Sequence, residues 1–237
     1  MNLNHILFLD IETVAQRKDF FELDFRLQKQ WEKKSKILFK DGSQTIEESY
    51  YDRAAIYAEF GKVVTIAVGI VDTSQENAQL RVKSFAGKDE HTVLLGFQQM
   101  LKTKMDESKI RFCAHNGKEF DYPYLARRMM VNGIELPKPL QLSGKKPWQV
   151  DHYDTMEMWK FGDIKNFTSL ELLATIFDIP SSKEAMDGSE VKDYYYQKDD
   201  LESIAKYCCE DVVVTAQLFL RLNNLSLIQS QNIKFIN

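Results

Sequence analysis

Four apolar runs rich in strand-forming residues constrain the fold of this chain more than any other feature. The first, HILFLDI at 5–11, is short and continuous, as expected of a buried strand. The second and third, VVTIAVGIV at 63–71 and LRVKSFA at 80–86, are separated by turn-forming residues that suit a hairpin. A fourth, IRFCAHN at 110–116, lies between stretches of helical periodicity. Strands followed by alternating helix and strand predict an α/β domain built on one mixed sheet flanked by helices.

Helical periodicity marks the stretches between and after these strands. After the fourth strand, Asp121 near the start, Pro123 in the first turn and Gly133 at the end are typical helix-boundary residues. Polar loops are expected at 137–147 and 180–192. The predicted helices cover residues 90–105, 121–133, 151–161, 169–179 and about 199–222.

The segment 17–59, between the first two strands, is charged and predicts one or two helices inserted after the first strand. Its apolar residues follow one another at helical spacing, at Phe20, Leu23, Leu27 and Trp31. The insertion is too short for an independent domain, and 237 residues suit one large domain. We therefore predict a single domain over 1–224, with 225–237 as a C-terminal tail and the only candidate for disorder.

Composition excludes several classes of protein. The three cysteines do not have the spacing of a metal site, which indicates a reducing compartment. No apolar run approaches the ~20 residues needed to span a bilayer, and the N-terminus has no basic leader. We expect a cytoplasmic protein without a membrane partner.

Two carboxylates lie two residues apart at the end of the first strand, in FLDIET. Because the side chains of a strand alternate between its faces, Asp10 and Glu12 are expected to point to the same side. They would repel each other there unless a cation lay between them. A solvent-facing strand end with two ordinary acids explains this fragment equally well.

Two later segments place further polar groups at defined spacings. In HNGKEFDYPYL, Asn116 follows a strand and Asp121 opens a helix, where an aspartate most often serves as the N-cap. In KYCCEDVVVT, Tyr207 and Asp211 are four residues apart in a helical stretch, so they lie one turn apart on one face. Each pair alone is unremarkable.

In combination and in this order, the three segments resemble the three exonuclease motifs of the DEDD superfamily, in the subgroup with tyrosine in the third motif. AHNGKEFDYPYLARR resembles the second motif of the proofreading domains of family-B DNA polymerases. The stretch from NFTSLELLATIFDIP through DGSEV to YCCEDVVVTAQLFLRL is similar to bacterial standalone proteins related to that domain. The histidine form of the third motif has its histidine where Lys206 stands here, which makes Tyr207 the candidate. The resemblance covers almost the whole chain, and 17–59 is its least diagnostic part.

The resemblance implies a ribonuclease H-like fold and a 3′→5′ exonuclease that hydrolyses terminal phosphodiesters of single-stranded DNA, releasing nucleoside 5′-monophosphates. It also implies two divalent cations, Mg²⁺ or Mn²⁺, which prefer oxygen ligands. Asp10 would bridge both ions, Glu12 and Asp211 would hold the first and Asp121 the second. Tyr207 would orient the attacking water, since a phenol with a pKa near ~10 is a poor base at neutral pH.

The formal net charge of −4 is unusual for a nucleic-acid-binding protein, because such proteins are generally basic. A protein that reaches phosphate through bound cations must gather carboxylates, and two divalent ions return four positive charges. The charge therefore argues against a tight, non-specific duplex binder and is compatible with an enzyme that holds a short strand end.

Further residues are candidates for contacts with the strand. Asn116 is predicted either to bond to the substrate or to satisfy backbone groups at its turn. Phe120 could stack on a terminal base, although a place in the core is the commoner role for such a residue. Thr13 is another candidate, and Lys183 and Ser189 are candidate phosphate contacts.

The insertion and one later aspartate lie outside these three motifs. The segment 17–59, with Trp31 beside four lysines, could form a wall of a strand channel, or equally a solvated basic helix with one anchoring tryptophan. These lysines are Lys29, Lys33, Lys34 and Lys36. Asp154 lies in a stretch that also resembles the family, and the sequence assigns it no role.

Alternative functions remain compatible with these motifs. An exoribonuclease of the same superfamily would carry the same acids, because the cations act on the phosphodiester that DNA and RNA share. A non-catalytic nucleic-acid-binding module on the same fold would be expected to lack at least one acid. A metal phosphatase on another fold would explain Asp10 and Glu12 but not the Tyr-x3-Asp helix. The expected partner is a 3′ end, with DNA repair or replication proteins as candidate protein partners and any proofreading performed in trans.

Overall fold

The computed structural model describes residues 2–74, 77–163, 167–180 and 186–236. Six strands of this part of the chain form one sheet, in the order β5-β4-β1-β2-β3-β6. β2 is antiparallel to β1 and β3, whereas β4 is parallel to β1 and β5, and β6 is parallel to β3. The predicted mixed sheet is thereby confirmed. The strands are β1 (Ile6–Ala15), β2 (Gly61–Asp72), β3 (Gln79–Ala86), β4 (Arg111–Ala114), β5 (Tyr153–Asp154) and β6 (Ile233–Phe235).

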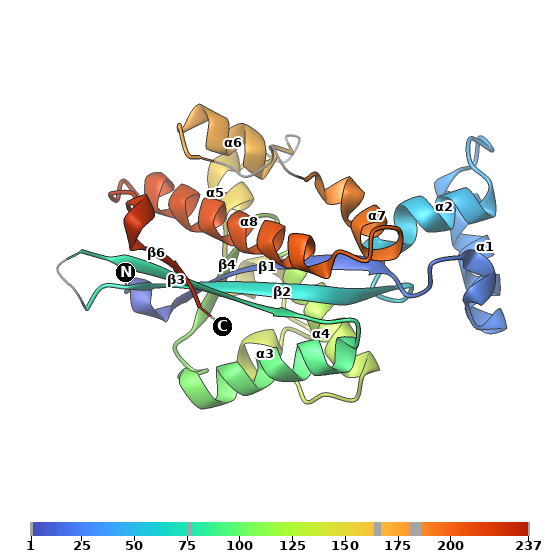
Figure 1. Cartoon of the computed structure of the whole chain (residues 1–237), viewed down its shortest axis with the longest axis horizontal. Coiled ribbons are helices and arrows are strands. Elements are labelled where there is room, and N and C mark those ends of the chain that lie inside the picture. Colours follow the sequence, from blue (N-terminus) through green and yellow to red (C-terminus); the bar gives the residue numbers. More distant parts are fainter. Residues whose placement is uncertain (1, 75–76, 164–166, 181–185, 237) are drawn as a thin grey trace.

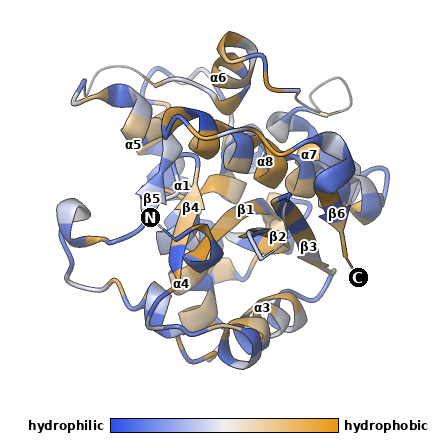
Figure 2. Ribbon diagram, turned by 90° about the vertical axis from the view of Figure 1, so that its left-hand side faces the viewer, coloured by the Kyte–Doolittle hydropathy of each residue, from blue (hydrophilic) through white to orange (hydrophobic). Residues whose placement is uncertain are grey.

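Helices cover both faces of the sheet. α3 and α4 lie on one face, and α8 crosses the other face with α5, α6 and α7 beside it (Figure 1). The largely apolar strands lie between these two layers (Figure 2). The helices are α1 (Phe25–Leu38), α2 (Ile46–Arg53), α3 (Glu90–Lys104), α4 (Asp121–Val131), α5 (Thr155–Lys160), α6 (Leu170–Ile176), α7 (Val191–Tyr196) and α8 (Leu201–Leu222). Within the described ranges, each helix is too short or too polar to pass through a bilayer.

The alternation of side chains along β1 divides the core into two parts. Leu7, Leu9 and Ile11 pack in the apolar cluster between the sheet and the helices α3 and α4. Ile6 and Phe8 pack in the opposite cluster, against the buried face of α8. Because side chains two residues apart share a face, the next residues in the Ile6–Phe8 register, Asp10 and Glu12, are directed toward α8. The apolar part of the strand thus fixes the direction of the acidic part.

The insertion forms α1 and α2 and packs around its own small apolar core beyond the end of the sheet (Figure 1). Trp31 is fully buried in this core. Its indole nitrogen donates to Ser49 Oγ at 3.1 Å and to the Ile46 carbonyl at 3.3 Å. Trp31 is therefore an anchoring residue of the insertion and not a surface of a strand channel, and a role of the segment 17–59 in such a channel stays a prediction.

Two predicted boundaries between 151 and 192 differ from the structure. The helix expected at 151–161 is preceded by β5 and begins at Thr155, because the Asp154 carboxylate caps it by accepting from the backbone N–H groups of Met156 and Glu157. The loop expected at 180–192 ends earlier, since α7 begins at Val191.

The stretch after residue 224 is not a free tail. Ile233–Phe235 pairs with β3, and the backbone amide of Ile236 donates to the Val82 carbonyl at 2.8 Å. Gln217 of α8 bonds both backbone groups of Ile228, at 2.7 and 3.0 Å. The described part of 225–237 is therefore fastened to the sheet and to α8, contrary to the expectation of disorder.

A buried ion pair joins the helices on the lower face to the sheet. Arg128 of α4 donates through two nitrogens to Glu90 of α3, at 2.6 and 2.8 Å, and through a third to the Ala58 carbonyl at 2.8 Å. Glu90 also accepts from the backbone amide of Val63 in β2 at 2.7 Å. Both charged side chains are over nine-tenths buried, so each depends on the other for its charge compensation.

We predict that Arg128→Met lowers the free energy of unfolding by about 3–5 kcal/mol, because it leaves the Glu90 carboxylate buried without its counter-charge. Lys102→Met is the matched control, since it breaks an exposed ion pair with Glu135 and should cost under about 1 kcal/mol. Urea unfolding of both variants measures the difference. Equal midpoints for the two would contradict the structural role of the buried pair.

Candidate active site

Asp10 and Glu12 lie on the part of β1 that extends past its parallel neighbour. β4 pairs with β1 only over Ile6–Phe8, and both acids follow that stretch. The register with β2 shifts between Glu12 and Thr13, which is a bulge directly after the second acid. Bulges turn the strand locally and re-aim side chains, and they are common beside functional sites.

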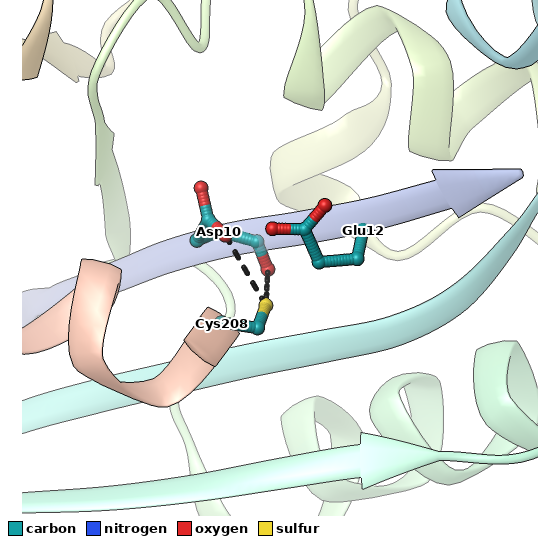
Figure 3. Close-up of side chains that lie close together, drawn as sticks. All are labelled: Asp10, Glu12 and Cys208. Atoms are coloured by element: carbon teal, nitrogen blue, oxygen red, sulfur yellow. Dashed lines mark hydrogen bonds between the residues drawn. The ribbon is translucent and has the colours of Figure 1, made fainter. Parts of the chain in front are cut away.

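Cys208 of α8 lies next to Asp10, with Glu12 further along β1 (Figure 3). Its Sγ is 3.2 Å from Asp10 Oδ2 and 3.4 Å from the Asp10 carbonyl. Ligand atoms of Asp10, Glu12 and Cys208 all lie within 4.8 Å of one another. This contact fixes the point at which α8 crosses β1.

The same helix, α8, also carries Tyr207 and Asp211 toward Asp10 and Glu12. α8 begins after Asp200, whose carboxylate accepts from the backbone amide of Ser203. Tyr207 is 5% exposed and hydrogen-bonds to Asp211 one turn later. The i, i+4 spacing predicted from the sequence therefore brings the phenol and the carboxylate together on the face toward β1.

Asp121 reaches the site from the other helical layer. It is the first residue of α4 and 4% exposed, while the N-cap position belongs to Phe120, whose side chain makes no capping bond. Its carboxylate accepts hydrogen bonds from its own backbone amide and from that of Ile11 in β1. Asp121 is therefore not the N-cap of α4. Its carboxylate bonds to β1, the strand that carries Asp10 and Glu12.

The four carboxylates act on one another electrostatically. Burial raises the pKa of Asp10 well above its usual range, and the charges of Glu12, Asp211 and Asp121 raise it further. Burial is also the main cause that raises the pKa of Asp121 to about 7. The charge of Asp154 raises it as well, and two backbone amides lower it. The negative charges of these acids thus lie close together in a poorly solvated place. No basic side chain is among the causes of either pKa shift.

The donor set fits hard divalent cations. Carboxylate oxygens are the ligands that Mg²⁺ and Mn²⁺ prefer, and a cation would relieve the repulsion among them. Burial, with the neighbouring carboxylates, raises the pKa of the Cys208 thiol, so it stays protonated and serves as a hydrogen-bond donor to Asp10. Asp10, Glu12, Asp121 and Asp211 are thus the residues that could hold metal.

Asp154 fixes the loop that leads from β4 into α4. Its carboxylate accepts from the backbone amides of Asn116 at 3.0 Å and Lys118 at 3.1 Å, besides those of Met156 and Glu157 in α5. This role was not predicted, although an aspartate directly before a helical run is a recognisable N-cap signal. Cys208 was also not predicted, because its contact with Asp10 depends on tertiary packing.

The three predicted substrate contacts, Asn116, Phe120 and Thr13, differ in their packing and hydrogen-bond partners. Asn116 adopts a positive φ of 64°, and its buried Oδ1 has no hydrogen-bond partner among the described residues. Phe120 is half-buried and packs against Tyr124, with ring centroids 5.3 Å apart. Thr13 Oγ1 donates to the Ala55 carbonyl at 3.0 Å. Their roles toward a substrate stay predictions.

The two candidate phosphate contacts precede α7. Ser189 is exposed, and its backbone amide donates to the Asp187 carboxylate at 2.9 Å. Lys183 lies outside the described residues.

Residues 56–232 match the model of a family described as predicted 3′–5′ exonucleases related to the exonuclease domain of PolB. The match covers more than half of the 237 residues. The chain belongs to this family. The matched stretch includes Asp121, Tyr207 and Asp211, whereas Asp10 and Glu12 precede it. The assignment of Asp10 and Glu12 to the site therefore depends on their position in the structure and not on the family match.

A solved structure supports the fold. The family B DNA polymerase from the hyperthermophilic archaeon Pyrobaculum calidifontis is similar over 91% of this chain, with a TM-score of 0.57 and 18% sequence identity. The similar part is 24% of the polymerase chain, so this protein spans about a quarter of its length. The predicted α/β, ribonuclease H-like fold is confirmed.

We predict that Asp10→Ala does not destabilise the metal-free protein, because it removes one of four mutually repelling carboxylates. The melting temperature in EDTA should equal or exceed that of wild type. Added Mg²⁺ or Mn²⁺ should raise it for wild type and much less for the variant, since ligands of the native state stabilise by mass action. A large drop in EDTA would contradict the arrangement of acids.

The contribution of Asp121 to the stability of the metal-free protein should fall as pH rises from about 4 to about 7. Over this window Asp121 keeps its proton in the folded state, with a pKa of about 7, and loses it in the unfolded state, with a pKa of 3.8. Folding therefore takes up a proton between these two pH values. The stabilisation from Asp121 is fully present below the unfolded-state pKa and is lost as the pH rises through the folded-state pKa.

Asp121→Asn should weaken this pH dependence, and the exposed Asp19→Asn should leave it unchanged. Melting temperatures in EDTA between these pH values provide the test. The same slope for wild type and Asp121→Asn would show that this carboxyl does not have the raised pKa.

Proposed function

We propose that the protein is a 3′→5′ exonuclease that hydrolyses terminal phosphodiesters of single-stranded DNA with two divalent cations and releases nucleoside 5′-monophosphates. The observation that carries this proposal is the electrostatic convergence of Asp10, Glu12, Asp121 and Asp211 from one strand and two helices. The family's relation to a DNA polymerase exonuclease domain supports DNA as the substrate.

The four carboxylates have the roles of metal ligands in this proposal. Asp10 and Glu12 share the upper face of β1, Asp211 faces them from α8, and Asp121 reaches them from the start of α4. When bound, the cations would lower the pKa of the attacking water and offset the charge that develops on the leaving 3′ oxygen. Asp10, which interacts with all three other acids, would be a ligand of the cations.

Tyr207 orients the nucleophile and does not act as a base. Burial and the charges of Asp211, Glu12 and Asp10 raise its pKa, so the phenol keeps its proton at neutral pH. A protonated phenol hydrogen-bonded to Asp211 is a fixed polar group beside the carboxylates. It can hold a water molecule in line with the phosphorus atom, which is a positioning contribution to the rate.

Incubation of 5′-labelled single-stranded DNA with the protein tests the activity. In Mg²⁺ or Mn²⁺ we expect a ladder of products that shortens from the 3′ end, and none in EDTA or with Asp10→Ala. The absence of shortening with both cations would refute the proposal. A matched RNA oligonucleotide is the comparison: faster degradation of RNA than of DNA would assign the protein as an exoribonuclease.

Tyr207→Phe should lower kcat on the order of 100-fold and change KM little, because a misplaced nucleophile costs about that factor. Tyr195→Phe is the matched control: its hydroxyl bonds to Lys62, at 3.0 Å, and its loss should leave kcat unchanged. Steady-state kinetics on a DNA oligonucleotide separate the two. Equal kcat values for Tyr207→Phe and wild type would remove Tyr207 from the mechanism.

A further inference from the structure

A groove with a volume of about 990 Å³ lies between α3 and β3, and we call it the α3–β3 groove. The α3 residues that line it recur at helical spacing from Gly96 to Lys104, so one face of the helix forms one wall. The other wall is β3, where Arg81, Lys83 and Phe85 alternate with residues directed to the opposite face. The groove is therefore built by two regular elements and not by loops.

The α3–β3 groove lies on the face of the sheet opposite to the candidate active site. Its floor includes Leu7 and Val68, which belong to the apolar cluster on the side of α3 and α4. Asp10 and Glu12 are directed toward α8, and α3 and α8 lie on opposite faces of the sheet (Figure 1). An occupant of the groove would therefore leave the candidate metal ligands uncovered.

A close contact between the two walls closes one end of the groove. A Cβ atom at Gly96 would lie 3.1 Å from the ring of Phe85, which is closer than an ordinary van der Waals contact. Glycine at this position therefore lets α3 approach β3. The groove extends from this contact to Lys104 and Met105 at the end of α3.

Apolar side chains in the groove are only partly covered. Ile70, Met100 and Met105 are half-buried, and Ile236 of the C-terminal stretch is 40% exposed. Sheets of this class normally have helices over both faces. Of the described helices, α3 alone lines the groove, so these side chains have room for a second helix over them. Methionine suits such a surface, because its flexible side chain adapts to the shape of a partner.

All charged side chains that line the groove among the described residues are basic, namely Arg81, Lys83 and Lys104. The whole chain has 35 acidic and 31 basic residues, so this set departs from the overall charge. None of the three forms an ion pair within the described ranges. Asp72 interacts electrostatically with Arg81 but does not line the groove. The three cations are thus available to an acidic occupant.

These features favour a polypeptide over a nucleic-acid strand. Sites for single strands combine cations with aromatic faces on which bases stack. The one aromatic residue in the lining is Phe85, and its ring packs edge-on against Phe97, with centroids 6.3 Å apart. The remaining apolar groups are aliphatic or thioether side chains. A helix with one apolar face and carboxylates at its margins matches both the floor and the rim, which is a common mode of peptide recognition.

We propose that the α3–β3 groove binds an acidic amphipathic helix of a partner protein. The apolar face of that helix would pack against Ile70 and Met100. Its carboxylates would pair with Arg81, Lys83 and Lys104. The inference goes beyond the proposed function and does not depend on it, because the groove and the candidate metal ligands lie on opposite faces of the sheet. The partner would determine where the protein acts without taking part in the chemistry.

The test uses two fluorescein-labelled peptides, each about four helical turns long. Both have leucines at the spacing of one helical face, and their other positions carry glutamate in one peptide and lysine in the other. Fluorescence anisotropy gives the dissociation constants without metal or DNA. Wild type should bind the glutamate peptide at least about tenfold more tightly than the lysine peptide, because like charges across an interface are strongly unfavourable.

Reversal of the rim charges tests which residues hold the carboxylates. Lys83→Glu combined with Lys104→Glu should weaken the binding of the glutamate peptide at least about tenfold and strengthen that of the lysine peptide. Lys33→Glu combined with Lys36→Glu is the matched control. It makes the same change of charge at two exposed lysines of α1, outside the groove, and should leave both affinities unchanged.

A substitution in the floor tests the apolar contact. Met100→Gln keeps the size and the helix propensity of the side chain and should weaken the binding of the glutamate peptide about tenfold. Met130→Gln is the matched control, because Met130 is an exposed methionine of α4 that does not line the groove. Urea unfolding should show that both variants remain folded under the conditions of the binding assay.

Several outcomes would overturn the inference. One is that wild type binds neither peptide or binds both equally, and another is that the charge-reversed double variant keeps its affinity for the glutamate peptide. A wild-type dimer that this variant dissociates, measured by light scattering, would assign the groove to a second copy of the chain. Displacement of the peptide by single-stranded DNA in EDTA would assign it to nucleic acid. Hydrolysis of DNA changes none of these measurements, so the inference and the proposed function fail separately.

Discussion

Repulsion among carboxylates where α8 crosses β1 is the constraint on which the rest of this structure depends. Asp10 lies within the electrostatic reach of three other acids, and burial adds to the cost of its charge. Such an arrangement persists only when surrounding packing holds it, because local strain at a functional site must be offset elsewhere. The apolar residues of β1 on both faces, the buried face of α8 and the Arg128–Glu90 pair supply that support.

The sequence predicted the parts of the site that follow from local periodicity. Alternation along a strand was sufficient to direct Asp10 and Glu12 to one face, and helical spacing was sufficient to pair Tyr207 with Asp211. Asp154 and Cys208 were missed because their partners are distant in sequence: Asp154 bonds to Asn116 and Lys118, and Cys208 to Asp10. Contacts of this kind are set by how elements pack, which a periodic pattern does not encode.

The fold of the insertion and of the C-terminal stretch could also be predicted only in part from the sequence. Periodicity indicated correctly that Trp31 belongs to the apolar side of a helix, but not that this side faces a core of its own. β6 has three residues and exposed side chains at two of them, so it carries too little pattern for a strand to be predicted. Its pairing with β3 depends on backbone hydrogen bonds, which any sequence can make.

Both borders of the sheet end in very short strands, two residues in β5 and three in β6. Unpaired backbone groups along a long, flat border would offer a template on which another polypeptide could add itself. β6 occupies three positions of the eight-residue β3, from Leu80 to Val82, and so shortens the border that β3 would otherwise present. The C-terminal stretch thereby shortens the border on which another polypeptide could add a strand.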